Sequence, residues 1–163
     1  MSLKSQFTNE EWSRVIQSPM LAGMAVTAAD PSGLWATIME TSAMARSIIE
    51  AKSNAGNSSL LQEISSAFET SEGRGIAQDG VKEVMGGKKA AEAAEAAVAS
   101  LAEIATLVAA KAPEQIASFK EFLRTIAQRV AEAGTEGGFL GFGGVKVSEA
   151  EKKTLADIDR VLA

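Results

Sequence analysis

Apolar residues recur at intervals of three and four positions along most of this chain, which is the spacing of an amphipathic helix. The pattern is clearest between positions 116 and 130, at Ile116, Phe119, Leu123, Ile126 and Val130. Charged and amide side chains fill most positions between them, so this helix is expected to bury one face and expose the other. The longest segment with strand character is only 144–147. The pattern therefore predicts an all-α fold.

Capping signals indicate where several helices begin. In a capping box, a Ser or Thr and a Glu three residues later each bind the backbone N–H of the other. Thr8 and Glu11 have this spacing, and so do Ser148 and Glu151. One of the two serines at 58–59 is expected to cap a further helix, since a serine hydroxyl satisfies a free N–H of the first turn.

Prolines and glycines divide the helical pattern. Pro19 is expected to kink or end the first helix, because proline removes a backbone donor and clashes with the preceding turn. The segment 30–33, with the sequence DPSG, is expected to separate two helices. Gly73 and Gly75 are expected to interrupt a third helix, so that only a short helix follows at 76–85.

The length of 163 residues suits one domain that can bury a hydrophobic core. We predict a compact single-domain bundle of about six to eight helices over residues 1–163, with residues 1–8 flexible. A weak internal repeat aligns 21–33 with 126–138, because both stretches pass from an alanine-rich helix into an acidic, glycine-containing turn.

The residue types that are absent exclude several kinds of chemistry. The chain contains no Cys and no His. It therefore cannot form disulfides, zinc–thiolate sites or a Ser-His-Asp triad by itself. Paired carboxylates could still perform acid–base catalysis, but nothing in their spacing singles out a pair. We expect a protein that is not an enzyme.

Charge and hydropathy limit the partners. The net charge is −5, and neither half of the chain has the basic surface typical of nucleic-acid binding. No apolar run approaches the roughly 18–20 residues of a membrane-spanning helix, so no transmembrane segment is expected. Residues 1–8 are polar and unlike a signal peptide. A cytoplasmic location is therefore expected.

The segment 137–144 contains five glycines and three large apolar residues, Phe139, Leu140 and Phe142. A glycine-rich loop before a helix can bind phosphate, but this loop lacks the Gly-Lys-Ser/Thr ending and is followed by acidic residues. The glycines can instead form turns while the apolar side chains close the end of the bundle. In a third interpretation, Phe139, Leu140 and Phe142 form an exposed tip that binds a protein partner, a membrane surface or a second copy.

Acidic residues mark two helix starts, Asp30 at one and Glu149 with Glu151 at the other. Carboxylates are favoured there by the helix dipole and by capping alone. If the two junctions meet in space, Asp30, Glu149 and Glu151 could instead bind a divalent cation such as Ca²⁺ or Mg²⁺. Convergence of the three on a cleft would favour a metal-assisted hydrolase.

Two stretches resemble the TerB-like (tellurite-resistance) family: AVTAADPSG at 25–33 and VSEAEKKTLADIDRVL at 147–162. Members of that family are compact all-α proteins with a small-residue helix, an acidic-glycine turn and a helix that opens with Val-Ser and then Glu. This chain has Pro31 where the family favours glycine, and the longer insert GGFLGFGG at its second junction. The resemblance implies a cytoplasmic role in metal-oxyanion or envelope-stress response, with a bound divalent cation.

The leading functional hypothesis is a non-enzymatic binding or scaffold protein of the stress-response type. Two alternatives stay open. One is the carboxylate-dependent, metal-assisted hydrolase, and the other is a homo-oligomeric structural module that associates through the apolar tip.

Overall fold

The computed structural model describes residues 2–29, 34–54, 56, 58–136 and 147–163. These residues contain seven α-helices, two short 3-10 helices and no strand, which confirms the predicted all-α bundle. In chain order they are η1 (Leu3–Gln6), α1 (Asn9–Ala29), α2 (Leu34–Asn54), α3 (Ser59–Glu69), α4 (Ser71–Met85), α5 (Ala90–Lys111), η2 (Pro113–Gln115), α6 (Ile116–Glu136) and α7 (Glu149–Val161).

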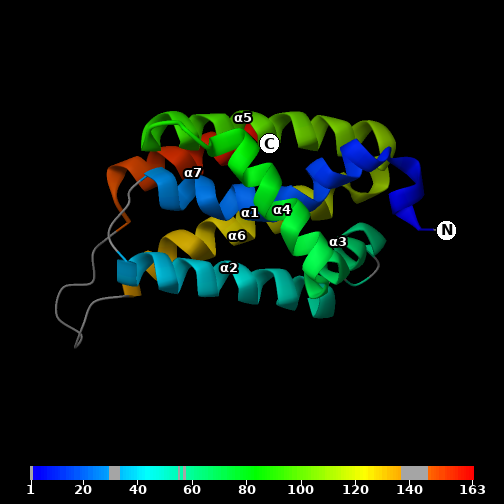
Figure 1. Cartoon of the computed structure of the whole chain (residues 1–163), viewed down its shortest axis with the longest axis horizontal. Coiled ribbons are helices and arrows are strands. Elements are labelled where there is room, and N and C mark those ends of the chain that lie inside the picture. The colour runs from blue at the N-terminus through cyan, green and yellow to red at the C-terminus, as the bar shows by residue number, and fades with distance from the viewer. Residues whose placement is uncertain (1, 30–33, 55, 57, 137–146) are drawn as a thin grey trace.

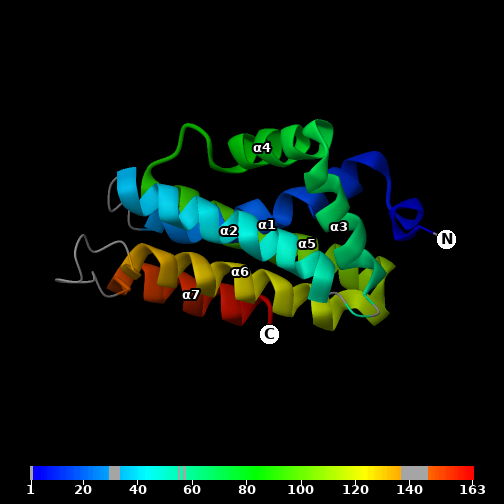
Figure 2. The same cartoon turned by 90° about the horizontal axis from the view of Figure 1, so that it is seen from below.

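Helix α1 is the central element of the bundle. Helices α1, α2, α5 and α6 run along the long axis of the molecule, α7 lies beside them, and α4 crosses obliquely (Figures 1 and 2). Helix α1 packs against α2, α4, α5, α6 and α7. A helix surrounded in this way needs apolar or small residues on most of its sides. The fully buried residues of α1 fit this requirement: Val15, Leu21, Ala22, Ala25 and Val26.

Pro19 does not end the first helix, so of the two outcomes expected there, a kink or an end, the end is wrong. Helix α1 continues through Pro19 to Ala29. Proline cannot donate to the carbonyl four residues earlier, that of Val15. The Ser18 hydroxyl donates to this carbonyl instead, at 2.7 Å. The neighbouring side chain thus replaces the missing backbone donor, and burial of the whole segment holds the helix together.

The junction between α3 and α4 also differs from the prediction, because α4 begins at Ser71 and includes both Gly73 and Gly75. Thr70 caps α4 by accepting a hydrogen bond from the Gly73 N–H at 3.0 Å. A Cβ on Gly73 would lie 2.2 Å from the Ala67 carbonyl oxygen. Gly73 therefore permits a close approach between the end of α3 and the start of α4, and does not interrupt a helix.

The N-terminal segment is packed against the bundle, although we expected residues 1–8 to be flexible. The carboxylate of Glu63 on α3 accepts hydrogen bonds from the Ser2 hydroxyl and from the backbone N–H groups of Leu3 and Lys4, at 2.8 to 2.9 Å. The side chains of Leu3 and Phe7 are buried. One glutamate thus supplies acceptors for donors that the short 3-10 helix cannot satisfy internally.

Both predicted capping boxes are confirmed. Glu11 accepts from the Thr8 N–H at 2.7 Å, and Thr8 accepts from the Glu11 N–H at 3.2 Å. Ser148 and Glu151 repeat these two bonds at 2.7 and 3.2 Å. The two starts are therefore fixed by local side-chain chemistry, as the sequence pattern indicates.

Among the described residues, α5 is the one helix long and apolar enough by composition to cross a membrane. We expected no such segment, because no uninterrupted apolar run approaches the roughly 18–20 residues of a span. Glutamates interrupt α5, but its many alanines raise the mean hydropathy of the helix. Of the most apolar window of α5, 44% is buried in the bundle. The buried positions pack against α1, α4 and α7, so α5 serves here as a core helix. The cytoplasmic location stays a prediction.

Candidate functional site

The two described carboxylates of the predicted metal site are engaged in capping and surface pairing. Glu151 is only 6% exposed, and its carboxylate accepts from the Ser148 N–H. Glu149 is exposed and pairs with Lys152 at 2.6 Å. Asp30 lies outside the described residues, and within those residues no group of three acidic side chains could hold a metal ion. A Ca²⁺ or Mg²⁺ site at these junctions therefore stays a prediction.

The predicted apolar tip also lies outside the part of the chain that the structure describes. Phe139, Leu140 and Phe142 fall within 137–146. A partner-binding role for these three side chains, and self-association through them, stay predictions.

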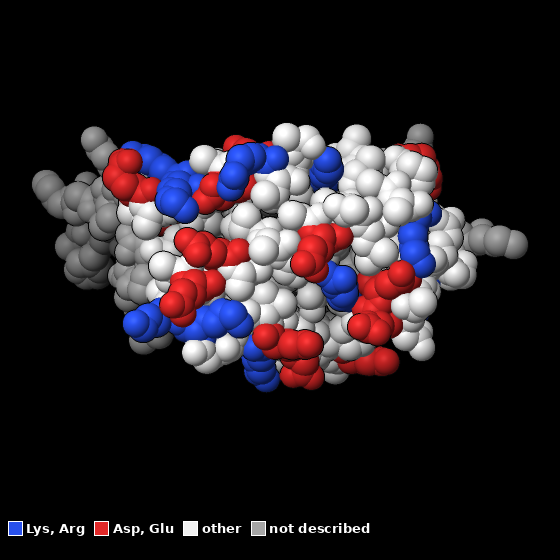
Figure 3. All heavy atoms as spheres, turned by 90° about the horizontal axis from the view of Figure 1, so that it is seen from above, with Lys and Arg blue, Asp and Glu red and all other residues white. Residues whose placement is uncertain are grey.

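A groove of about 760 Å³ lies between α1, α4 and α5 and is called the α1–α4–α5 groove below. Helix α4 crosses obliquely in front of α1 while α5 runs along the bundle, so the helices diverge (Figure 1). Apolar walls come from Ile76 and Val84 on α4 and from alanines of α5. Figure 3 shows the α5 side of the molecule from above, where charged side chains of both signs are interspersed with uncharged surface.

Gln17 forms part of this groove and is an unusual core residue. It is only 7% exposed, and no described residue forms a hydrogen bond with its side-chain amide. A Cβ on Gly80 of α4 would lie 1.6 Å from the Gln17 Oε1 atom. The absence of a side chain at Gly80 thus creates the space that the amide occupies. Buried polar groups in native proteins normally have partners, so each exception needs an explanation.

Ser100 of α5 lines the same groove and is likewise a buried polar residue without a described hydrogen-bond partner. It is 9% exposed, and its hydroxyl has no hydrogen-bond partner among the described residues. Five other buried polar residues of the structure do have partners: Ser18, Ser47, Ser58, Ser65 and Glu151. Among the described residues, Thr154 is the one other buried polar residue without a hydrogen-bond partner, and it lines a separate pocket of about 160 Å³ between α5 and α7. Two of three such groups therefore gather in one groove.

The rim of the groove carries more acidic than basic groups. Arg14 of α1 and Glu103 of α5 form an ion pair at 2.5 Å between the two helices. Asp79 pairs with Lys82 at 3.5 Å along α4. Three further charged residues of the rim have no ion-pair partner among the described residues: Glu10, Glu83 and Lys88. The lining therefore contains four carboxylates, two cationic side chains and a floor of two unpartnered hydrogen-bonding groups.

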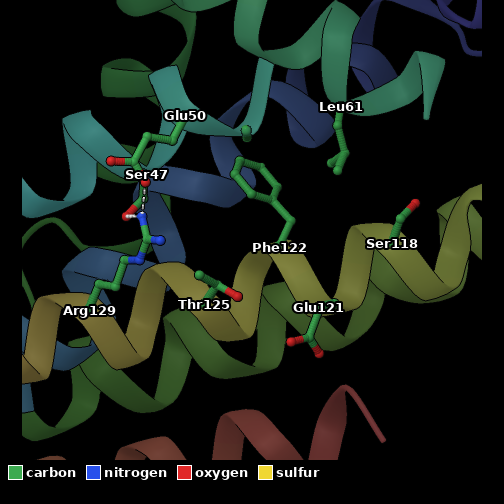
Figure 4. Close-up of a pocket in the computed structure, with 9 residues that line it drawn as sticks. Ser47, Glu50, Leu61, Ser118, Glu121, Phe122, Thr125 and Arg129 are labelled. Carbon is green, nitrogen blue, oxygen red and sulfur yellow. Dashed lines mark hydrogen bonds and ion pairs between the residues drawn. The ribbon is translucent and has the colours of Figure 1, made fainter. Parts of the chain in front are cut away.

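A second pocket, of about 260 Å³, lies between α2, α3 and α6 and is called the α2–α3–α6 pocket below (Figure 4). Its polar groups are largely bound to each other. Arg129 donates to the Glu50 carboxylate and, at 3.4 Å, to the Ser47 hydroxyl. The single O–H of Ser118 lies within hydrogen-bond distance of two acceptors, the Gln115 carbonyl oxygen at 3.0 Å and the Ser58 hydroxyl at 3.2 Å. A ligand would have to compete with these contacts.

A third hollow, of about 310 Å³, is mainly apolar and lies where α1, α2, α3 and α4 meet. Its wall includes Ile49, a large hydrophobic side chain that is 70% exposed. Arg74 lies at this hollow, and its guanidinium donates to the Phe68 carbonyl and the Ser71 hydroxyl. Nothing in the structure shows what would cover this surface.

Sequence reasoning missed Gln17, Ser100 and Gly80. Two weak signals were present. Gln17 follows Val15 and Ile16 in a stretch that is otherwise apolar or small, and Gly80 stands in the middle of a helix, where glycine is unfavourable unless packing requires it. Neither signal reveals whether a buried group has a partner, because the partner would come from a helix distant in sequence.

Comparisons of this chain with models of protein families, with curated proteins and with solved structures found no match. The resemblance to the TerB-like family therefore stays a prediction.

Proposed function

We propose that this protein is a non-enzymatic binding protein and that the α1–α4–α5 groove holds a small polar molecule. The observation that carries the proposal is the pair Gln17 and Ser100, two buried side chains that lack hydrogen-bond partners and line one groove. A buried polar group without a partner destabilises the fold by about 1–3 kcal/mol. Such groups have a physical reason to persist when a ligand supplies the missing bonds.

The dimensions and lining of the groove support the same function. Its volume of about 760 Å³ lies within the range of small-molecule sites. The lining is more polar than that of most small-molecule sites, because charged and polar side chains outnumber the apolar ones, and such a lining suits a polar ligand. The amide of Gln17 offers both donors and an acceptor, and the hydroxyl of Ser100 offers one donor and lone pairs. These groups can orient a ligand but supply no reaction by themselves.

The described residues of the groove include no nucleophile that is hydrogen-bonded to a base, which favours binding over catalysis. A serine nucleophile needs an adjacent base, and the Ser100 hydroxyl has no hydrogen-bond partner among the described residues. The metal-assisted hydrolase and the oligomeric module remain alternatives that depend on Asp30 and on the 139–142 tip. The stress-response role implied by the TerB-like resemblance remains a separate proposal about the pathway.

Thermal melts in the presence of defined small molecules test the proposal. The panel contains a cation (n-butylamine), an anion (butyrate), a neutral alcohol (n-butanol), a zwitterion (L-serine) and a neutral amide (acetamide). A ligand at about 100 times its dissociation constant stabilises the native state by roughly 2.7 kcal/mol. For a domain of this size the melting temperature then rises by several degrees.

Three variants locate the binding site. We expect the ligand-induced shift to be absent in Gln17→Leu and in Ser100→Ala, each compared with its own ligand-free melt. Thr154→Ala is the matched control, because it removes a buried unpartnered hydroxyl from a different pocket. The shift should persist in that variant. No shift with any compound, or a shift that persists in both groove variants, contradicts the proposal.

A further inference from the structure

We infer that the ligand of the α1–α4–α5 groove is a primary alkylammonium cation. This inference rests on the proposed binding function and specifies the chemical class of the ligand. Three features of the groove carry it: the charge of its rim, the acceptor atoms at its floor and the apolar strip along its walls.

The rim favours a cation. Its carboxylates belong to Glu10, Asp79, Glu83 and Glu103, whereas its cationic groups are Arg14 and Lys88. Arg14 is bound to Glu103 across the groove and Asp79 to Lys82 along α4, which leaves two carboxylates, Glu10 and Glu83, and one cation, Lys88, without an ion-pair partner among the described residues of the rim. An anionic ligand would meet this excess of carboxylates, whereas a cation is attracted by it. The excess agrees with the net charge of −5 for the chain.

The floor supplies hydrogen-bond acceptors of the type that an ammonium group requires. An alkylammonium has three N–H donors and no acceptor. The Gln17 amide oxygen and the Ser100 hydroxyl oxygen are buried acceptors without a donor among the described residues. Hydrogen bonds from a charged donor are stronger than neutral ones, so a cation repays the desolvation of the floor more fully than a neutral ligand does.

The walls discriminate between classes of cation. The described residues that line the groove include no aromatic side chain, and recognition of quaternary ammonium groups relies on aromatic faces. No three acidic residues of the described chain cluster tightly enough to hold a metal ion. Ile76, Val84, Ala96 and Ala99 offer an apolar strip that an alkyl chain can cover. A short alkyl chain with a terminal ammonium fits all three features: the ammonium fits the acceptors of the floor and the carboxylates of the rim, and the alkyl chain fits the apolar strip of the walls.

The experiment is isothermal titration of the full-length protein with n-butylamine, n-butanol, butyrate and tetramethylammonium. The four probes separate charge sign and donor capacity at similar size. We expect measurable binding of n-butylamine alone. The dissociation constant should rise about tenfold in Gln17→Leu, which removes a hydrogen bond to a charged group. Glu10→Gln and Glu83→Gln should each raise it about two- to fivefold, because solvent screens these exposed carboxylates.

Glu114→Gln is the charge-matched control. Glu114 is an exposed carboxylate on η2 outside the groove, so its neutralisation changes the net charge by the same amount. It should leave the dissociation constant unchanged. If it weakens binding as much as Glu10→Gln and Glu83→Gln do, the amine binds the acidic surface in general, and both proposals are overturned.

The probes distinguish failure of this inference from failure of the proposed function. If n-butanol or butyrate binds as tightly as n-butylamine, and Gln17→Leu weakens that binding, the groove is a ligand site but its ligand is not a cation. If tetramethylammonium binds as tightly as n-butylamine, charge without N–H donors is sufficient, and the primary ammonium is wrong. If none of the four binds, the cation inference fails, and the proposed function then depends on L-serine and acetamide.

Discussion

The α1–α4–α5 groove and the α2–α3–α6 pocket are both hollows between three helices, but they differ in hydrogen bonding. Most polar side chains of the pocket have partners, whereas the two buried ones of the groove have none among the described residues. In the pocket, Arg129 is bound to Glu50 and Ser47 (Figure 4). The Ser118 hydroxyl lies within hydrogen-bond distance of the Gln115 carbonyl oxygen and the Ser58 hydroxyl. In the groove, Gln17 and Ser100 are more deeply buried than Arg129 and have no such partners within the described chain. A hollow on a helical surface is therefore a poor indicator of a site until its hydrogen bonds are counted.

The difference indicates different roles. The contacts of the pocket join residues 79 and 82 positions apart, so they fasten α6 to α2 and contribute to the native packing. The Arg129–Glu50 pair is half-exposed, and pairs of this kind contribute only about 0–1 kcal/mol. The pocket is thus part of the packing between α2, α3 and α6, and its contribution to the stability of the fold comes chiefly from its apolar floor. The groove contributes less to the core and retains free hydrogen-bonding capacity.

Truncation of an apolar side chain in each hollow should give the largest contrast. Phe122 at the pocket is buried against the core, so Phe122→Ala should lower the free energy of unfolding by about 3–5 kcal/mol. Val84 on the groove wall is half-buried, so Val84→Ala should lower it by only about 1 kcal/mol. Urea unfolding of both variants measures the difference. Equal losses in the free energy of unfolding would show that the groove contributes as much to the native packing as the pocket does.

Substitution of buried serines should give a smaller effect of opposite sign in the two regions. Ser100→Ala removes an unpartnered hydroxyl and improves helix propensity, so it should raise the free energy of unfolding by about 0.5–1.5 kcal/mol. Ser65 lies one helical turn after the pocket residue Leu61 and donates to the Ile48 carbonyl of α2 at 3.0 Å. Ser65→Ala loses this bond and should lower the same quantity by about 0.5–1 kcal/mol.

The same urea titrations measure both serine variants, with the unmodified protein as reference. Destabilisation by Ser100→Ala in the absence of ligand would show that its hydroxyl already contributes to the fold. The distinction between the two regions would then no longer hold.

Local signals in the sequence predicted much of the fold. The capping boxes at Thr8 and Ser148 were found because their hydrogen bonds connect residues three positions apart. The apolar period of α6 was found because a helix repeats its buried face every three to four residues. These features depend only on neighbours in the chain, and for that reason pattern analysis is most reliable for them.

The misplaced helix boundaries arose where tertiary contacts overrode a local rule. Pro19 remains helical because Ser18 satisfies the Val15 carbonyl and the surrounding helices bury the segment. Gly73 lies inside α4 because Thr70 caps the helix through the Gly73 N–H, and the missing side chain permits the close approach to the end of α3. A single sequence does not show which neighbouring residues allow a helix to include a proline or a glycine.

The candidate site was not predicted for a related reason. Gln17, Gly80 and Ser100 come from three helices, and their common property is the absence of a partner within the described chain. Sequence patterns identify residues by type and spacing, and none of these three belongs to a recognised motif. The acidic helix starts attracted attention instead, and Glu149 and Glu151 proved to serve as a surface pair and a cap.

The smallest expected effect concerns pH, and it tests whether Ser100 is truly independent of charged groups. The Lys111 ammonium donates to Glu11 at 2.6 Å and holds the pKa of that carboxyl below its ordinary value of 4.5. Hydrogen bonding from Lys153 likewise lowers the pKa of Asp157 below 3.8 and raises the pKa of Lys153 above 10.5. A lowered carboxyl pKa stabilises the fold above the ordinary value, and this stabilisation is lost as the pH falls through the folded-state pKa.

The raised pKa of Lys153 has the opposite sign, because its stabilisation is complete below the ordinary value of 10.5 and is lost as the pH rises through the folded-state pKa. Melting temperatures should therefore be level between about pH 6 and 9 and fall on the acid side, with a smaller fall in Glu11→Gln and Asp157→Asn. Neither carboxyl lines the groove. The stabilisation by Ser100→Ala should consequently stay constant along the acid limb, and a gain that varies with pH would reveal a titrating partner of Ser100.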